Sequence, residues 1–148
     1  MIPDKKEFVR HCIKFVEAKL SSLLLIQAEL GNSLHHETKS TAGDKHETAR
    51  AMLQLEQEKL GKQIKEWELV KESVEKLSHN INMLANSQLI ETDKGLFFVY
   101  CHLGKIEFNG QTVMGISPAS PLGNELLKQK EGGKFNINSN SYLILKKH

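Results

Sequence analysis

Apolar residues in the N-terminal half recur at helical spacing. In the first segment they follow one another at alternating intervals of four and three residues, a heptad seam interrupted by one polar residue: Val9, Ile13, Val16, Leu20, Leu23, Gln27, Leu30 and Leu34. A second segment repeats the pattern, with charged Glu56 and Lys71 at two weak points: Ala49, Leu53, Leu60, Ile64, Trp67, Val74, Leu77 and Ile81. The pattern predicts two long amphipathic helices.

A short polar stretch separates these segments. Residues 38–43 read Thr-Lys-Ser-Thr-Ala-Gly, a composition typical of a connection between helices. Each helix of about 30 residues would be about 45 Å long. Two matched helices with a short connection predict an antiparallel coiled-coil hairpin over residues 1–83. The polar end of the hairpin indicates that it projects toward another molecule. The alternative interpretation is a coiled coil that forms a dimer.

Residues 84–148 follow a different pattern, in which short apolar runs alternate with turn residues. Aromatic and β-branched runs and an Asn109-Gly110 turn predict strands at 96–100, 105–108, 111–116, 135–137 and 142–145. Ser120 followed by Pro121 predicts the start of a short helix with a buried side of leucines, Leu122, Leu126 and Leu127. These elements predict a small antiparallel sheet with one helix, so the fold class of the chain is α+β.

The composition supports two different halves. Three of the ten glycines precede residue 84 and seven follow it, so the single domain expected from 148 residues becomes a helical hairpin (1–83) and a second domain (84–148). The formal net charge is only +2, which argues against a nucleic-acid coat or a polybasic membrane anchor. The length also excludes large catalytic folds such as a TIM barrel.

Targeting and redox features are few. The apolar runs, such as 23–26, are far shorter than a membrane span, and no secretory signal is visible, so we expect a cytoplasmic protein that does not contact a membrane. The two cysteines, Cys12 and Cys101, form no CxxC motif and are expected to be reduced thiols. We also expect a monomer.

The sharpest local motif is Gly43-Asp44-Lys45-His46-Glu47 at the start of the second helix. Asp44 and Glu47 are three residues apart, so their carboxylates share one helix face. Two such oxygen ligands suit Mg²⁺ when water and outside ligands complete its octahedron. The same spacing is that of a capping box, in which both carboxylates satisfy backbone N–H groups. Both interpretations remain open, and an exposed carboxylate has enough lone pairs for both.

Other candidate sites are weaker. His35, His36 and His46 flank the predicted hairpin end, but their spacing matches no standard metal site, which favours polar surface histidines. The sequence contains no phosphate-binding loop, and Ser117 and Ser120 lie in no nucleophile elbow. No self-contained enzyme active site is visible, so we expect no catalytic residues of the chain's own and no stably bound cofactor.

Two motifs together resemble the GreA/GreB family of bacterial transcript-cleavage factors. Residues 43–49, Gly-Asp-Lys-His-Glu-Thr-Ala, are similar to the G-D-x-x-E-N-A of the family's hairpin tip. Residues 116–127, Ile-Ser-Pro-Ala-Ser-Pro-Leu-Gly-Asn-Glu-Leu-Leu, are similar to a stretch of its C-terminal domain. The order and separation of these motifs fit as well, so the resemblance covers nearly the whole chain.

The resemblance implies an FKBP-like C-terminal domain that docks on RNA polymerase, with docking expected around Ser117, Pro118, Ser120, Pro121 and Leu122. It further implies that the hairpin enters the secondary channel and that Asp44 and Glu47 help to hold a Mg²⁺ ion shared with the polymerase active centre. Water would then cleave backtracked RNA by two-metal hydrolysis. The implied role is in transcription elongation, with DNA binding and indirect contact with nascent RNA, and the polymerase is the catalyst.

Two positions depart from the family pattern at the tip. Thr48 stands where the family has Asn, and Ala51 stands where it has an aromatic residue. The departures leave two alternatives, a regulator that enters the channel without stimulating cleavage and a structural coiled-coil adaptor.

Overall fold

The computed structural model describes residues 3–39 and 43–148, without the side chains of residues 36–46. In chain order its elements are α1 (Lys5–Lys39), α2 (Gly43–His79), α3 (Ile81–Asn86), β1 (Gln88–Thr92), β2 (Gly95–Val99), β3 (Gly104–Phe108), β4 (Gln111–Ile116), α4 (Pro121–Lys128), β5 (Lys134–Ile137) and β6 (Asn140–Lys147). They form two compact units. We call residues 3–15 with 72–148 the sheet unit and residues 16–71 the helix unit. The predicted domain boundary after residue 83 stays a prediction.

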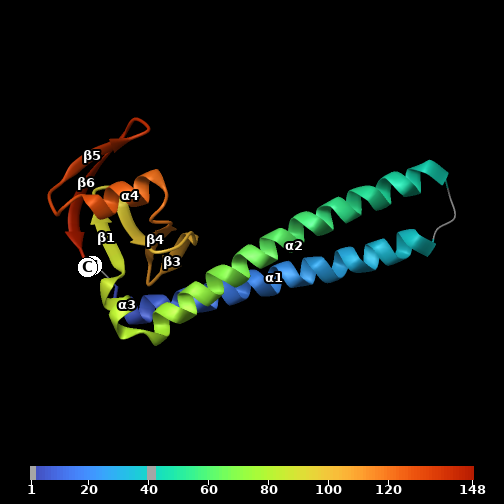
Figure 1. The fold of residues 1–148 in the computed structure, drawn as a ribbon, viewed down its shortest axis with the longest axis horizontal. Helices are drawn as coiled ribbons and strands as arrows, with labels where there is room; N and C mark the ends of the chain where they lie inside the picture. The colour runs from blue at the N-terminus through green and yellow to red at the C-terminus, as the bar shows by residue number, and fades with distance from the viewer. Residues whose placement is uncertain (1–2, 40–42) are drawn as a thin grey trace. The chain divides into compact units, whose positions relative to one another are not determined.

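The strands of the sheet unit pair in the order β3-β4-β2-β1-β6-β5 (Figure 1). Their pairing is antiparallel except between β2 and β4, which run parallel from Leu96 opposite Val113 to Val99 opposite Ile116. The predicted antiparallel sheet is confirmed at the other pairs and is wrong at this one. Because β3 lies between β2 and β4 in the chain and returns along β4, it reverses the chain direction and makes the parallel pairing possible.

Two tight turns fix the hairpin registers. Asn109 and Gly110 both have positive φ, 50° and 77°, as a two-residue turn between right-twisted strands requires. This confirms the turn predicted from the Asn-Gly pair. Asn138 and Ser139 also have positive φ, 49° and 69°, between β5 and β6. The later strands therefore lie where the sequence placed them, within one or two residues.

Both faces of the sheet are covered by helices. On one face α4 inserts Leu126 into a cluster with Ile90, Phe97, Val99 and Ile144. On the other face Phe8 of α1 contacts Phe98 and Phe108 edge to face, with ring centroids 5.2 and 5.6 Å apart. Since β2 therefore supplies buried side chains to both faces, it is the central strand of the unit's core.

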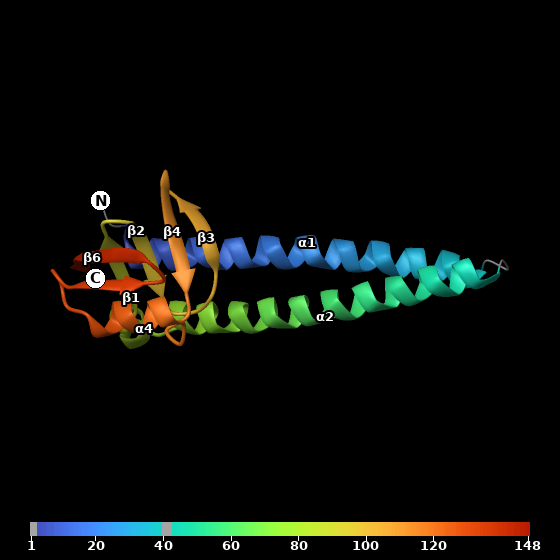
Figure 2. The same ribbon diagram turned by 90° about the horizontal axis from the view of Figure 1, so that it is seen from above.

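The helix unit is an antiparallel helix pair, and α1 and α2 run side by side in both views (Figures 1 and 2). Within it the predicted seam positions Leu20, Leu23, Leu60 and Ile64 are buried. Side chains also contact each other across the pair: Lys19 Nζ lies 5.8 Å from the centre of the Trp67 ring, and Lys71 Nζ lies 4.0 Å from Glu17 Oε1.

The seam of the second helix ends earlier than predicted. Ile81 belongs to the separate helix α3 and is 84% exposed, so its predicted place on the seam is wrong. Asn80 has an extended backbone and caps α3, its side-chain oxygen accepting a hydrogen bond from Met83 N at 3.0 Å. This cap starts a new helix, so the residues after Asn80 no longer follow the apolar spacing of the α2 seam.

The start of α4 tests the helix N-cap that was predicted from the sequence at Ser120. Ser120 Oγ accepts a hydrogen bond from Gly123 N at 3.0 Å, and Pro121 follows at the first helical position. This confirms the predicted N-cap. Replacing Ser120 with alanine removes the cap and is expected to lower the free energy of unfolding by about 1 kcal/mol. Denaturant unfolding of wild type and S120A measures the loss, and Ser141→Ala, at an exposed strand position, should change little.

Candidate functional site

The two candidate carboxylates lie within the first five residues of α2. That helix begins at Gly43, so Asp44 and Glu47 occupy helical positions three residues apart and share one face of the helix. The side chain of Glu47 is exposed, whereas that of Asp44 lies outside the described residues. Glu47 therefore presents its carboxylate to solvent at the positive end of the helix dipole, where negative charge is favoured.

The metal and capping interpretations both remain predictions. A capping box would require hydrogen bonds from the side chain of Asp44, which lies outside the described residues, as do those of His36 and His46. Among the described residues no cluster of three or more His, Cys, Asp or Glu side chains could hold a metal ion. Glu47 by itself offers at most two oxygen ligands to an octahedral Mg²⁺ ion, so a metal site here would need further ligands.

The second candidate region, residues 117–122, is a tight turn leading into α4. Ser120 Oγ donates to the carbonyl oxygen of Ser117 at 2.7 Å, and Ser117 Oγ accepts from Ala119 N at 3.1 Å. A Cβ atom at Gly123 would lie 2.1 Å from that same Ser117 oxygen, so only glycine fits there. Both serine hydroxyls are therefore used inside the turn, which indicates that they shape the loop.

The predicted docking residues differ in accessibility. Leu122 is partly buried and packs against the sheet cluster, so it stabilises α4. Pro118 and Pro121 are exposed. Pro118 also lines a hollow of about 510 Å³ with Leu127, and its other walls come from α3 and the strands beside it: Asn80, Asn82, Met83, Asn86, Ser87, Gln88, Val99 and Tyr100. Of the five predicted docking residues, the two prolines are the exposed ones.

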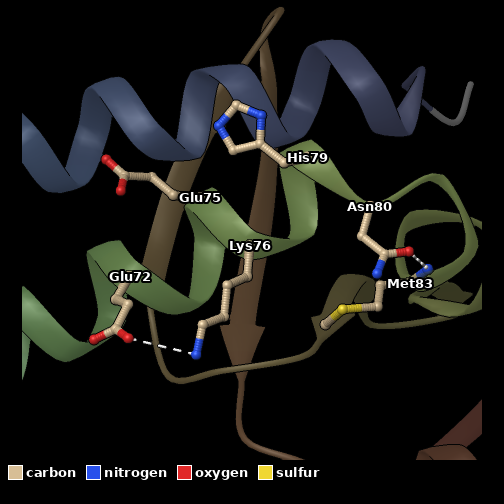
Figure 3. A pocket seen from close by; sticks show the side chains of 6 residues that line it. All are labelled: Glu72, Glu75, Lys76, His79, Asn80 and Met83. Carbon is tan, nitrogen blue, oxygen red and sulfur yellow. Dashed lines mark hydrogen bonds and ion pairs between the residues drawn. The ribbon is translucent and has the colours of Figure 1, made fainter.

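Sequence reasoning missed the α3 side of this surface. A second hollow of about 510 Å³ follows the end of α2 to Asn80 and Met83, and Figure 3 shows its lining side chains. Its charged residues include an exposed ion pair, Lys76 Nζ to Glu72 Oε1 at 3.4 Å, which contributes little to stability. The sequence did hold a clue to α3, because Asn80 is a typical helix cap that interrupts the apolar period.

Both cysteines are free thiols in the sheet unit. Burial, followed by the nearby Cys101 thiol, raises the pKa of Cys12 to about 12, and burial raises the pKa of Cys101 to about 11. Because thiolates are the reactive form, both side chains are poorly suited to nucleophilic chemistry at neutral pH. They serve as packing groups in the structure.

These shifts predict how stability depends on pH. Well below pH 9, the ordinary pKa of a thiol here, both thiols are protonated in the folded and unfolded chains, so their contribution to the free energy of unfolding is fully present. As the pH rises from 9 toward 11 and 12 the unfolded chain loses thiol protons first, and the free energy of unfolding falls. Denaturant unfolding between pH 8 and about 10.5 should show a steeper fall for wild type than for Cys12→Ala with Cys101→Ala. Equal slopes would contradict the buried-thiol account.

Comparison of the chain with protein-family models, with curated proteins and with solved structures found no match. Among the helices that the structure describes, none is sufficiently long and apolar to cross a membrane.

Proposed function

We propose that this chain is a transcription factor of the GreA/GreB type, which binds RNA polymerase through the secondary channel and stimulates cleavage of backtracked RNA. The observation that carries the proposal is the pair of acidic positions within the first five residues of α2, with the Glu47 carboxylate exposed. Support also comes from the antiparallel helix pair and from the α+β unit in the same chain. In this proposal the protein lends ligands to the polymerase and is not itself an enzyme.

The chemistry assigns a limited role to each side chain. The carboxylate oxygens of Asp44 and Glu47 offer hard, negatively charged ligands on one helix face. When bound there, Mg²⁺ supplies Lewis-acid activation of the water that attacks the RNA phosphodiester. The helix positions both carboxylates, and the polymerase contributes the remaining ligands and the substrate. The proposal includes a cytoplasmic location and a Mg²⁺ ion that is shared with the polymerase.

The experiment is addition of the purified protein to stalled, backtracked elongation complexes with a labelled RNA 3′ end. The proposal predicts rapid release of short 3′ fragments, together with co-migration of the protein and polymerase in size-exclusion chromatography. Absence of both binding and fragments would contradict it and favour the structural adaptor.

A second candidate function is favoured by the two departures at the tip. Thr48 and Ala51 are both exposed on α2, one turn or less from Glu47, and they replace the Asn and the aromatic residue of the family pattern. Both positions lie close to Glu47 along the helix, so their chemistry bears on cleavage more than on binding. A non-cleaving channel regulator would bind polymerase and alter promoter output without releasing fragments.

A further inference from the structure

The turn between β3 and β4 has the sequence and the exposure that chemical modification of an asparagine requires. Asn109 is followed by Gly110, and both residues are exposed. Their φ angles are 50° and 77°, so they form the tip of a two-residue hairpin. Phe108 lies opposite Gln111 in the register of this hairpin. The ladder hydrogen bonds at the tip therefore belong to these two flanking residues, and the backbone N–H of Gly110 stays outside the ladder.

The relevant chemistry is attack of a backbone nitrogen on the preceding asparagine side chain. A bond forms between the Gly110 nitrogen and Cγ of Asn109, and the bond between Cγ and Nδ2 breaks. The proton of the Gly110 nitrogen goes to the departing group, so ammonia leaves and a cyclic succinimide remains. Water then opens this ring at either carbonyl, which gives aspartate or isoaspartate. In isoaspartate the main chain runs through the former side-chain carboxyl carbon. Water is the only co-reactant.

The residue after an asparagine decides how easily the ring closes. The sequence contains a single Asn-Gly pair, and glycine has no Cβ to obstruct its nitrogen or to restrict its backbone angles. Asn138 offers a close comparison, because it is also exposed and also lies at a hairpin tip with positive φ, 49°. It is followed by Ser139, whose Cβ crowds the attacking nitrogen. The β3–β4 tip is therefore the more reactive of the two.

We propose that Asn109 is a site of spontaneous deamidation in the folded protein, and that isoaspartate there loosens the contact of the β3–β4 hairpin with α1. Phe108 directly precedes the site, and its ring centroid lies 5.6 Å from that of Phe8 and 5.0 Å from that of His11. Strand β3 lies at the edge of the sheet and pairs with β4. Isoaspartate adds a methylene group to the main chain of a turn that fixes the hairpin register. This inference does not depend on the proposed polymerase function.

Mass spectrometry of tryptic peptides tests the site after incubation of the full chain near neutral pH. The peptide 106–128 should gain about 1 Da as an amide becomes a carboxylic acid, with fragment ions placing the gain at Asn109. Asn138, in the peptide 135–146, is the internal control. It should react at least about fivefold more slowly, because Ser139 carries the Cβ that glycine lacks.

The same incubation in guanidinium chloride separates the effect of the fold from that of the sequence. Because the tip is exposed, Asn109 in the folded chain should react within about threefold of its rate in the denatured chain. A denatured chain that gains mass at Asn109 while the folded chain gains none would overturn the proposal. Equal rates at Asn109 and Asn138 in the folded chain would overturn it as well.

Asn109→Asp isolates the effect of the longer main chain from that of the new charge. The freshly purified variant has the charge of the isoaspartate form, and Asp-Gly suits the same turn, so it should unfold at the same denaturant concentration as wild type. The isoaspartate form, purified from aged protein and identified with an isoaspartate-specific methyltransferase, should unfold at a lower concentration. Its β3 amide hydrogens should exchange at least about threefold faster. Identical unfolding and exchange of the isoaspartate form and fresh Asn109→Asp would contradict the loosened contact.

Discussion

Replacing Phe98 with alanine is expected to lower the free energy of unfolding by about 3–5 kcal/mol. Phe98 is fully buried on the central strand β2. Its ring centroid lies 5.2 Å from that of Phe8 and 6.0 Å from that of Tyr100, so it joins the start of α1 to the sheet. Truncation would remove this aromatic contact and leave a cavity where the surrounding residues cannot fully collapse.

The measurement is chemical denaturation followed by circular dichroism and by intrinsic fluorescence. Phe135→Ala is the control, because Phe135 is only partly buried and stacks on Tyr142 near the edge of the sheet. Phe135→Ala should lower the free energy of unfolding clearly less than Phe98→Ala does. Similar losses for the two variants would contradict a core centred on β2.

The second large effect concerns cleavage activity. Asp44→Asn combined with Glu47→Gln is expected to slow fragment release from backtracked complexes about 100-fold or more, because metal-ion stabilisation of the transition state is worth several kcal/mol and each factor of ten corresponds to about 1.4 kcal/mol. The amides keep nearly the same size but lose the negative charge that Mg²⁺ prefers. Quenched-flow analysis of labelled RNA would measure the rates.

The matched control for this experiment lies on the same helix. Glu56 and Glu58 are exposed acidic residues of α2, farther along the chain than the first turn. Glu56→Gln with Glu58→Gln changes the net charge by the same amount and should leave the cleavage rate within about twofold, since exposed helix substitutions have small effects. Polymerase binding measured in parallel should be unchanged in both double variants. If the two double variants slow cleavage equally, the cause is the change in net charge, and the predicted metal-binding role of Asp44 and Glu47 is contradicted.

Local patterns in the sequence predicted much of the fold because local chemistry decides those features. The heptad seam placed Leu20, Leu23, Leu60 and Ile64 in the buried stripe, and the Asn109-Gly110 pair specified a turn that needs positive φ at both residues. Ser120 with Pro121 marked the first turn of α4 correctly. Each prediction depends on a few neighbouring residues whose preferences agree with the final structure.

Longer-range features could not be predicted in this way. Strand β1 is only five residues long, and its mixed sequence Gln-Leu-Ile-Glu-Thr carries no clear alternation, so its place depends on pairing with β2 and β6. The parallel β2–β4 pair depends on how the intervening β3 returns. At the candidate site the spacing of Asp44 and Glu47 follows from helix geometry. Completing a metal site would take ligands that this spacing does not specify.

A Mg²⁺ titration of fragment release tests the central claim most directly. If Asp44 and Glu47 lend ligands to the polymerase active centre, wild-type protein should lower the Mg²⁺ concentration for half-maximal cleavage by at least about tenfold, and Asp44→Asn with Glu47→Gln should restore the value for polymerase alone. The same Mg²⁺ dependence with and without the wild-type protein would contradict the claim.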